Sequence, residues 1–126
     1  MGNLWIALGA LLGGLSVLIG AFAAHSLRGV LSVSALTLVE TGARYQMYHA
    51  LALLGVGLLG ICSKEPSVLL KITGCCFGAG ILCFSGSLYG LSLGNMAWLG
   101  PVTPIGGLLL IVGWGALAIA ALTLKP

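Results

Sequence analysis

Four long apolar stretches dominate the sequence, and short polar segments separate them. The stretches cover residues 4–24, 43–62, 69–91 and 104–124. A helix needs roughly 20 residues to cross the hydrocarbon core of a bilayer, and each stretch reaches that length. Because the stretches lack the alternation of apolar and polar residues that is typical of membrane barrels, they predict an all-α protein. We expect a single transmembrane domain over residues 1–126, built as a four-helix bundle.

The segment between the first two stretches, residues 26–41, has a different pattern. Its apolar residues recur at helical spacing, whereas Arg28 and Glu40 lie off that stripe. This pattern is typical of a short amphipathic helix that lies at the membrane interface, and Gly42 offers a bend into the second span. The alternative is one continuous helix over about 34–62, which is longer than the membrane is thick. We predict the bent arrangement with a separate interfacial helix.

Composition strengthens the membrane interpretation. Hydrophobic residues make up 60 % of the chain, and only 7 of 126 residues are charged, whereas a soluble domain has about 25 % charged residues. We therefore expect membrane lipid to surround the protein. The net charge of +3 is too small and too scattered to indicate a nucleic-acid partner.

The positions of Lys and Arg predict the orientation in the membrane. With four spans, both termini share a side with the polar turn at residues 63–67. That side carries Lys64, Lys71 and Lys125, and the opposite side carries Arg28 and Arg44. The excess of basic residues predicts that both termini are cytoplasmic, in a bacterial inner membrane.

Glycine is abundant, with 21 residues, and many of them lie inside the predicted spans. Small residues let helices approach closely in lipid, where packing replaces the hydrophobic driving force. Pairs spaced four residues apart, such as Gly9 with Gly13 and Gly74 with Gly78, predict a tight bundle in which Gly78 makes a close contact. The same kind of face can join copies of the chain, so a homo-oligomer stays open.

Most of the unusual polar side chains are predicted near one end of the bundle. Glu40 and Arg44 are four residues apart with the carboxylate first, which is the favourable order for an ion pair on a helix. His49 lies one to two turns inside the second span, and we expect it to hydrogen-bond to the end of the first helix near His25. Ionisable groups at that depth are costly and are therefore functional candidates. The candidate cluster consists of His25, Arg28, Glu40, Arg44, Tyr45, Tyr48, His49 and Asn95.

The cluster has two interpretations. Arg and Tyr side chains near a helix end also anchor at lipid headgroups, which would make the cluster structural. Alternatively, the cluster is a site for a ligand, a proton or a lipid. The chain has no Asp and only two Glu, so it lacks the set of nucleophile, base and orienting group that hydrolysis needs. We expect no catalytic site, no metal and no cofactor, and we interpret the four cysteines as packing residues.

Three segments resemble a known family. They are residues 20–27 (GAFAAHSL), residues 40–51 (ETGARYQMYHAL) and residues 104–114, which begin with PIGG and end with GW. Together they are similar to the small integral membrane proteins of domain of unknown function 423, also called the transmembrane-protein-256-like or UPF0382 family, found in bacteria and mitochondria. One mild departure is Ala23, where the family often has Gly. The resemblance implies a four-helix membrane protein without an established activity. It also marks five positions, without giving them a role: His25, Arg44, Tyr45, Tyr48 and His49.

Two classes of function fit these expectations. The first is a non-enzymatic structural or accessory component that helps to assemble a larger membrane complex. The second is a small oligomeric transporter, channel or lipid-binding protein that uses the cluster at the start of the second span. A hydrophilic cavity lined by His25, Arg44 and His49 would favour the second class. A dry cluster with every polar group paired would favour the first.

Overall fold

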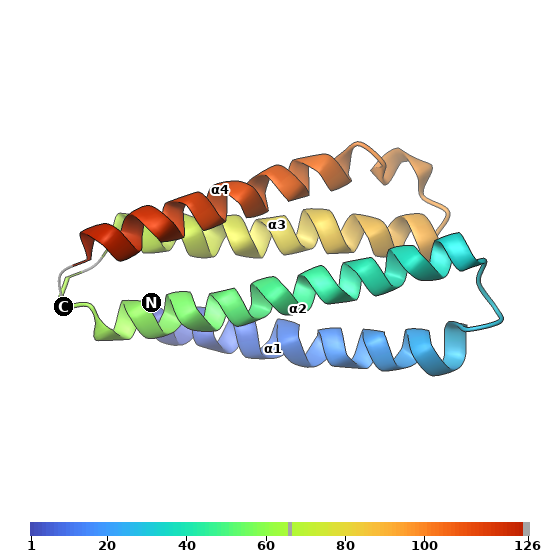
Figure 1. The fold of residues 1–126 in the computed structure, drawn as a ribbon, viewed down its shortest axis with the longest axis horizontal. Coiled ribbons are helices and arrows are strands. Elements are labelled where there is room, and N and C mark those ends of the chain that lie inside the picture. The colour runs from blue at the N-terminus through green and yellow to red at the C-terminus, as the bar shows by residue number, and fades with distance from the viewer. Residues whose placement is uncertain (66, 125–126) are drawn as a thin grey trace.

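The computed structural model describes residues 1–65 and 67–124. Four long helices account for most of this part of the chain, and each is long and apolar enough to cross a membrane. The described residues contain no strand, so the prediction of an all-α, four-helix protein is confirmed (Figure 1). The elements are α1 Gly2–Phe22, a π-helical turn Ala23–Leu27, α2 Val33–Cys62, α3 Val68–Leu93, a 3-10 turn Ala97–Leu99 and α4 Val102–Thr123.

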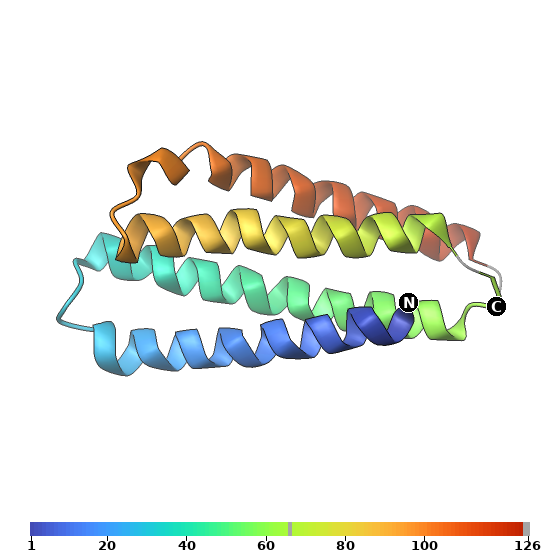
Figure 2. The ribbon, with the colours of Figure 1, turned by 180° about the vertical axis from the view of Figure 1, so that it is seen from behind.

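The four helices run antiparallel to their neighbours in the chain. α1 packs mainly on α2, α4 packs mainly on α3, and α2 also packs along α3. As a result α2 and α3 form the centre of the bundle, with α1 and α4 beside them. The start of α1 and the end of α4 lie at the same end of the bundle as the connection between α2 and α3 (Figures 1 and 2).

The separate interfacial helix predicted before the second span is wrong. α2 begins at Val33, where the hydroxyl of Ser32 accepts a hydrogen bond from the backbone amide of Ala35 at 3.2 Å, and it continues as one helix to Cys62. Gly42 does not bend it. A Cβ atom on Gly42 would stand 2.6 Å from the Tyr89 ring, so this glycine allows α3 to approach α2 closely.

The apolar stripe that suggested an interfacial helix packs inside the bundle instead. Val39 is fully buried together with Ala23 and Leu27 of the π-helical turn. The wider π turn places Ala23 and Leu27 on the side of the first helix that faces α2. This second small core explains why α2 extends beyond the length that a bilayer requires, since its first turns cover the end of α1.

Glycines allow the closest helix contacts, although not at the position that spacing suggested. A Cβ atom on Gly9 would stand 2.7 Å from the Ala50 carbonyl oxygen across the contact between α1 and α2. A Cβ atom on Gly106 of α4 would collide with the backbone of Phe84 in α3. At Gly78 the nearest atom, in Leu8, would be 3.8 Å away, which is ordinary van der Waals contact. The expectation that Gly78 makes a close contact is therefore wrong.

Candidate functional site

Gln46 joins three helices from the centre of the bundle. Its side chain is 2 % exposed. The amide Nε2 donates to the carbonyl oxygen of Leu12 in α1 at 2.8 Å, and the amide Oε1 accepts from the hydroxyl of Tyr89 in α3 at 2.9 Å. Because donor and acceptor are both engaged, the orientation of the amide is fixed. Gln46 is not among the predicted candidates, although a glutamine inside an apolar span was a usable signal.

Two buried serines flank Gln46 and donate to carbonyl oxygens of α2. The hydroxyl of Ser16 in α1 bonds to Ala43 at 2.6 Å, and the hydroxyl of Ser85 in α3 bonds to Gly42 at 2.7 Å. Hydrogen bonds between membrane helices average about 0.6 kcal/mol. We call this hydrogen-bonded set the polar layer; its members are Ser16, Gln46, Ser85 and Tyr89.

His49 is buried one turn further along α2 and binds α4. Its Nδ1 lies 2.6 Å from the carbonyl oxygen of Tyr45, and its Nε2 lies 3.1 Å from Nε1 of Trp114. A carbonyl can only accept and an indole N–H can only donate, so the imidazole is neutral with the proton on Nδ1. The expected hydrogen bond from His49 to the end of the first helix is therefore wrong.

Aromatic rings surround His49 and separate it from the outside. The centroid of the Phe77 ring lies 5.6 Å from that of the His49 imidazole and 5.1 Å from that of the Trp114 indole. The Phe77 and Trp114 rings pack edge to face. Tyr45 and Phe84 pack with centroids 4.9 Å apart. Distances and tilts of this kind are favourable between aromatic rings. His49 therefore belongs to a packed interface between α2, α3 and α4.

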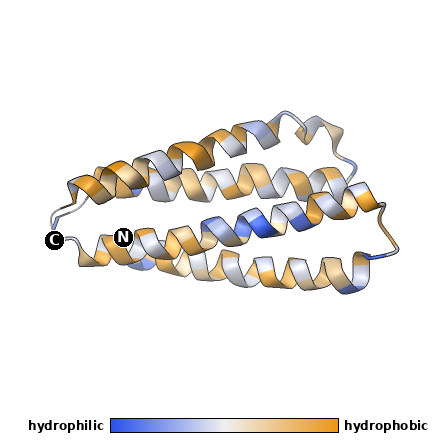
Figure 3. Cartoon of the chain, viewed as in Figure 1, coloured by the Kyte–Doolittle hydropathy of each residue, from blue (hydrophilic) through white to orange (hydrophobic). Residues whose placement is uncertain are grey.

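Arg44, Tyr45 and Tyr48 lie on the exterior of α2, and we call them the outward face of α2. Arg44 is exposed, and the side chains of Tyr45 and Tyr48 are 40 % and 52 % exposed. A hydrophilic patch is visible midway along α2 in Figure 3. Glu40, one turn earlier, is partly buried and forms no ion pair with Arg44 within 4.0 Å, so the predicted ion pair is not formed.

An open hollow of about 540 Å³ lies beside this face, between α1 and α2. It combines apolar walls with one carboxylate, one guanidinium and one phenol. Its lining residues are Ser16, Val17, Gly20, Glu40, Ala43, Arg44, Met47 and Tyr48. His49 and His25 do not line it, so it is not the hydrophilic cavity that would have joined them to Arg44.

The remaining candidates lie in the connections. His25 is exposed on the π-helical turn, and Arg28 is exposed in the loop that follows. Asn95 is exposed after the end of α3, with a φ of 51°, a conformation that Asn adopts more readily than most residues. The backbone conformation of this turn therefore explains why an Asn stands at position 95. The predicted cluster is divided into an interior histidine, an exterior face and two exposed connections.

The described part of the chain contains no group of three or more His, Cys, Asp or Glu side chains that could hold a metal ion. Its buried polar side chains bond to backbone carbonyls, either of a neighbouring helix (Ser16, Gln46 and Ser85) or of their own helix (His49, Thr73 and Ser87). The fold and the site together define a small integral membrane protein with a hydrogen-bonded helical core.

Comparisons with known proteins give the family. Residues 19–107 match the family model described as "Protein of unknown function (DUF423)". The UPF0382 membrane protein SAB0533 of Staphylococcus aureus is 47 % identical over 118 residues, which cover 94 % of each chain. The UPF0382 membrane protein of Haemophilus influenzae is 40 % identical over 118 residues, covering 94 % of this chain and 93 % of the relative.

YwdK, a UPF0382 membrane protein of Bacillus subtilis, is 40 % identical over 121 residues, covering 94 % of this chain and 96 % of the relative. No solved structure matches. The chain belongs to the DUF423 family, which confirms the resemblance and makes it a membrane protein of an uncharacterised family.

Proposed function

We propose that this protein is a non-catalytic accessory component of a bacterial inner-membrane complex, and that it binds its partner through the outward face of α2. The observation that carries the proposal is the exposure of Arg44, Tyr45 and Tyr48 at a depth where lipid tails would otherwise surround them. The partner is a second membrane-spanning protein, either another copy of this chain or a different one.

The depth of this face follows from the polar layer. Ser16 bonds to the Ala43 carbonyl, so Arg44 lies near the level of Ser16. The uncharged stretch of the first helix continues to Ala24, eight residues or about 12 Å further along the axis. A charged side chain at the centre of a membrane helix costs about 2.5–3.5 kcal/mol. Polar groups of a partner helix would reduce that cost.

The packing of the interior supports a scaffold rather than an enzyme. Both nitrogens of His49 are engaged, one by a backbone carbonyl and one by Trp114. Gln46 likewise uses its donor and its acceptor within the bundle. Groups bound in this way hold helices together, and freeing either residue for proton transfer would cost the bundle its hydrogen bonds.

A photoreactive amino acid at Tyr48 tests the proposal in the native membrane. The matched control is the same amino acid at Leu11, which is 73 % exposed on α1 and lies outside the outward face of α2. We expect position 48, and not position 11, to crosslink to one protein of defined mass. Equal crosslinking from both positions, or crosslinking to lipid alone from position 48, would contradict the proposal.

A second candidate function is a small oligomeric transporter, channel or lipid-binding protein. The open hollow beside Arg44 favours it, because it places a guanidinium and a carboxylate in one lipid-accessible cavity. In that case position 48 would crosslink to lipid or a small solute, and Arg44→Gln would abolish that adduct without changing the melting temperature.

We also propose that both termini are cytoplasmic. The connection after α2, which contains Lys64, and the first turn of α3, which contains Lys71, lie at the end of the bundle where α1 starts and α4 ends; the connection before α2, which contains Arg28, lies at the other end (Figure 1). Lys125, which contributed to the expected orientation, lies outside the described residues. The support is therefore the positive charge around the connection between α2 and α3.

A further inference from the structure

Trp5 of α1 carries a polar atom that the bundle does not satisfy. Its indole ring packs against Gly74 of α3, where a Cβ atom would collide with the ring. Within the part of the chain that the structure describes, its Nε1 is the buried side-chain polar atom without a hydrogen-bond partner. An unsatisfied buried donor costs about 1–3 kcal/mol, and such groups in native structures call for an explanation.

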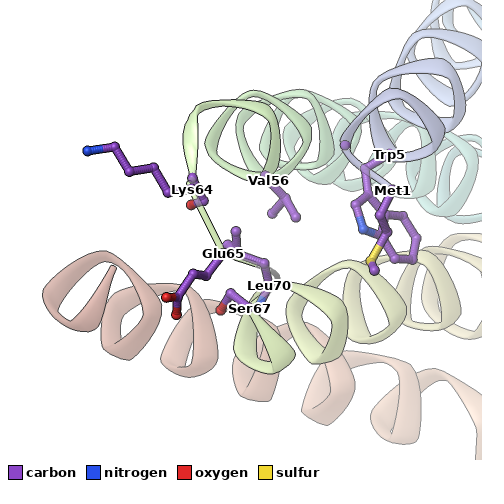
Figure 4. Close-up of a pocket in the computed structure, with 10 residues that line it drawn as sticks. Met1, Trp5, Val56, Lys64, Glu65, Ser67 and Leu70 are labelled. Carbon is purple, nitrogen blue, oxygen red and sulfur yellow. Dashed lines mark hydrogen bonds between the residues drawn. The ribbon is translucent and has the colours of Figure 1, made fainter. Parts of the chain in front are cut away.

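Trp5 is a lining residue of two cavities. The first, of about 340 Å³, opens at the end of the bundle where α2 turns into α3 (Figure 4). The second, of about 300 Å³, is a groove between α1 and α3. Trp5 lines both of them. A single elongated molecule that occupied both the end pocket and the groove would have to pass the Trp5 side chain.

The two cavities differ in polarity along their length. Polar side chains of the connection, Ser63, Lys64, Glu65 and Ser67, lie around the end pocket. Figure 4 shows Lys64 and Glu65 across the pocket from Trp5, with the Lys64 ammonium extending outward. The groove has apolar walls, among them Leu8, Leu12 and Leu82. A polar mouth at the helix ends that leads into an apolar groove matches a membrane lipid.

We propose that the end pocket and the groove bind one phospholipid with an amine-bearing headgroup. An acyl chain lies in the groove, and the Trp5 indole N–H donates to an ester or phosphate oxygen at the junction. In the complex the Lys64 side chain turns inward to the phosphate, and the Glu65 carboxylate approaches the ammonium group. This site lies at one end of the bundle, whereas the outward face of α2 lies midway along that helix, so the site does not depend on the function proposed above.

The two opposite charges at the mouth, on Lys64 and Glu65, decide the headgroup. A lysine alone would suit any anionic lipid, but Glu65 on the same connection repels a second negative charge and attracts a cation. Phosphatidylethanolamine presents one phosphate and one ammonium group, which complement Lys64 and Glu65. Phosphatidylglycerol presents only the phosphate, so we expect it to bind more weakly.

Titration of the delipidated protein in mild detergent with dioleoyl phosphatidylethanolamine, followed by native mass spectrometry, tests the site. We expect one saturable lipid per chain. Trp5→Phe keeps the ring and removes the donor, so the affinity should fall about tenfold, the loss of one hydrogen bond. In the absence of lipid the same variant should be at least as stable as the parent, because it removes an unsatisfied group.

Gly78→Leu places a side chain in the groove, since Gly78 lines it with space for a Cβ atom. Gly86→Leu is the matched control on the same helix, where a Cβ atom would meet nothing within 4 Å. We expect Gly78→Leu to lose the saturable lipid and Gly86→Leu to retain it. If Gly78→Leu does not fold, Trp5→Phe decides the outcome.

Glu65→Gln tests the headgroup in the same titration. It should remove the preference for phosphatidylethanolamine over dioleoyl phosphatidylglycerol. Absence of a saturable lipid, or equal affinity of the parent and Trp5→Phe, would overturn the proposal. Equal binding of the two lipids by the parent chain would overturn the assignment of the headgroup.

Discussion

Replacing Gln46 by Leu should destabilise the bundle more than any other conservative change in the polar layer. The side chain keeps a similar volume but loses both hydrogen bonds, the one to the Leu12 carbonyl at 2.8 Å and the one from Tyr89 at 2.9 Å. Each bond between membrane helices contributes about 0.6 kcal/mol on average. The hydroxyl of Tyr89 is also left without its partner, at about 1 kcal/mol for the lower end of such penalties. The expected loss is roughly 2 kcal/mol.

A double-mutant cycle with Tyr89→Phe isolates the interaction between the two side chains. We expect Tyr89→Phe to cost about 1 kcal/mol by itself. It should cost clearly less in the Gln46→Leu background, where its partner is already gone. The measurement is reversible unfolding in detergent followed by circular dichroism, with Met47→Leu as the neighbouring control. Additive effects of Gln46→Leu and Tyr89→Phe, or a loss for Gln46→Leu no larger than for Met47→Leu, would refute the reasoning.

Three further results are expected. His49→Phe should lower stability by about 1 kcal/mol because it leaves the Trp114 indole without its acceptor, and Trp114→Phe should cost a similar amount; unchanged melting temperatures would contradict this pairing. Gly106→Ala should destabilise strongly, since its methyl group meets the backbone of α3, whereas Gly115→Ala should be tolerated because its Cβ meets nothing within 4 Å; similar melting temperatures for the two would be the contrary outcome. Cys62, exposed at the end of α2, should react with a membrane-impermeant maleimide in inverted vesicles and not in right-side-out vesicles, as cytoplasmic termini require; the reverse would invert the topology.

The sequence predicts four helices long and apolar enough to cross a membrane, because length and hydropathy are the properties that a bilayer selects. The sequence misleads at Gly42, which lies between an amphipathic segment and an apolar one. A glycine at such a position can bend the helix or let a neighbouring helix approach closely, and the local sequence is the same in both cases. The contact with Tyr89 distinguishes the two possibilities. That contact lies 47 positions away in the chain, and its register follows from the packing of α2 on α3.

The sequence could predict which residue types form the candidate site, but it could not predict the directions in which their side chains point. Arg44 and His49 are five residues apart, which on a helix of 3.6 residues per turn separates them by about 140°. One of them must therefore face away from the other, but helical spacing does not say which one faces the bundle. The decision comes from Trp114 on α4, whose indole N–H meets the imidazole. No local pattern around His49 contains that information.

The groups that the bundle leaves unsatisfied lie at two separate places, and their separation has a measurable consequence. The outward face of α2 lies at the level of Ser16, and the unpaired donor of Trp5 lies 11 residues earlier on α1, or about 16 Å along the axis. Effects of changes more than about 7–10 Å apart without shared partners usually add. A partner on the outward face and a lipid at Trp5 should therefore bind independently. We expect Arg44→Gln to reduce crosslinking from position 48 without changing lipid affinity, and Trp5→Phe to do the reverse. A loss of both properties in either variant would mean that the two places form one site through the packing of α1 on α2.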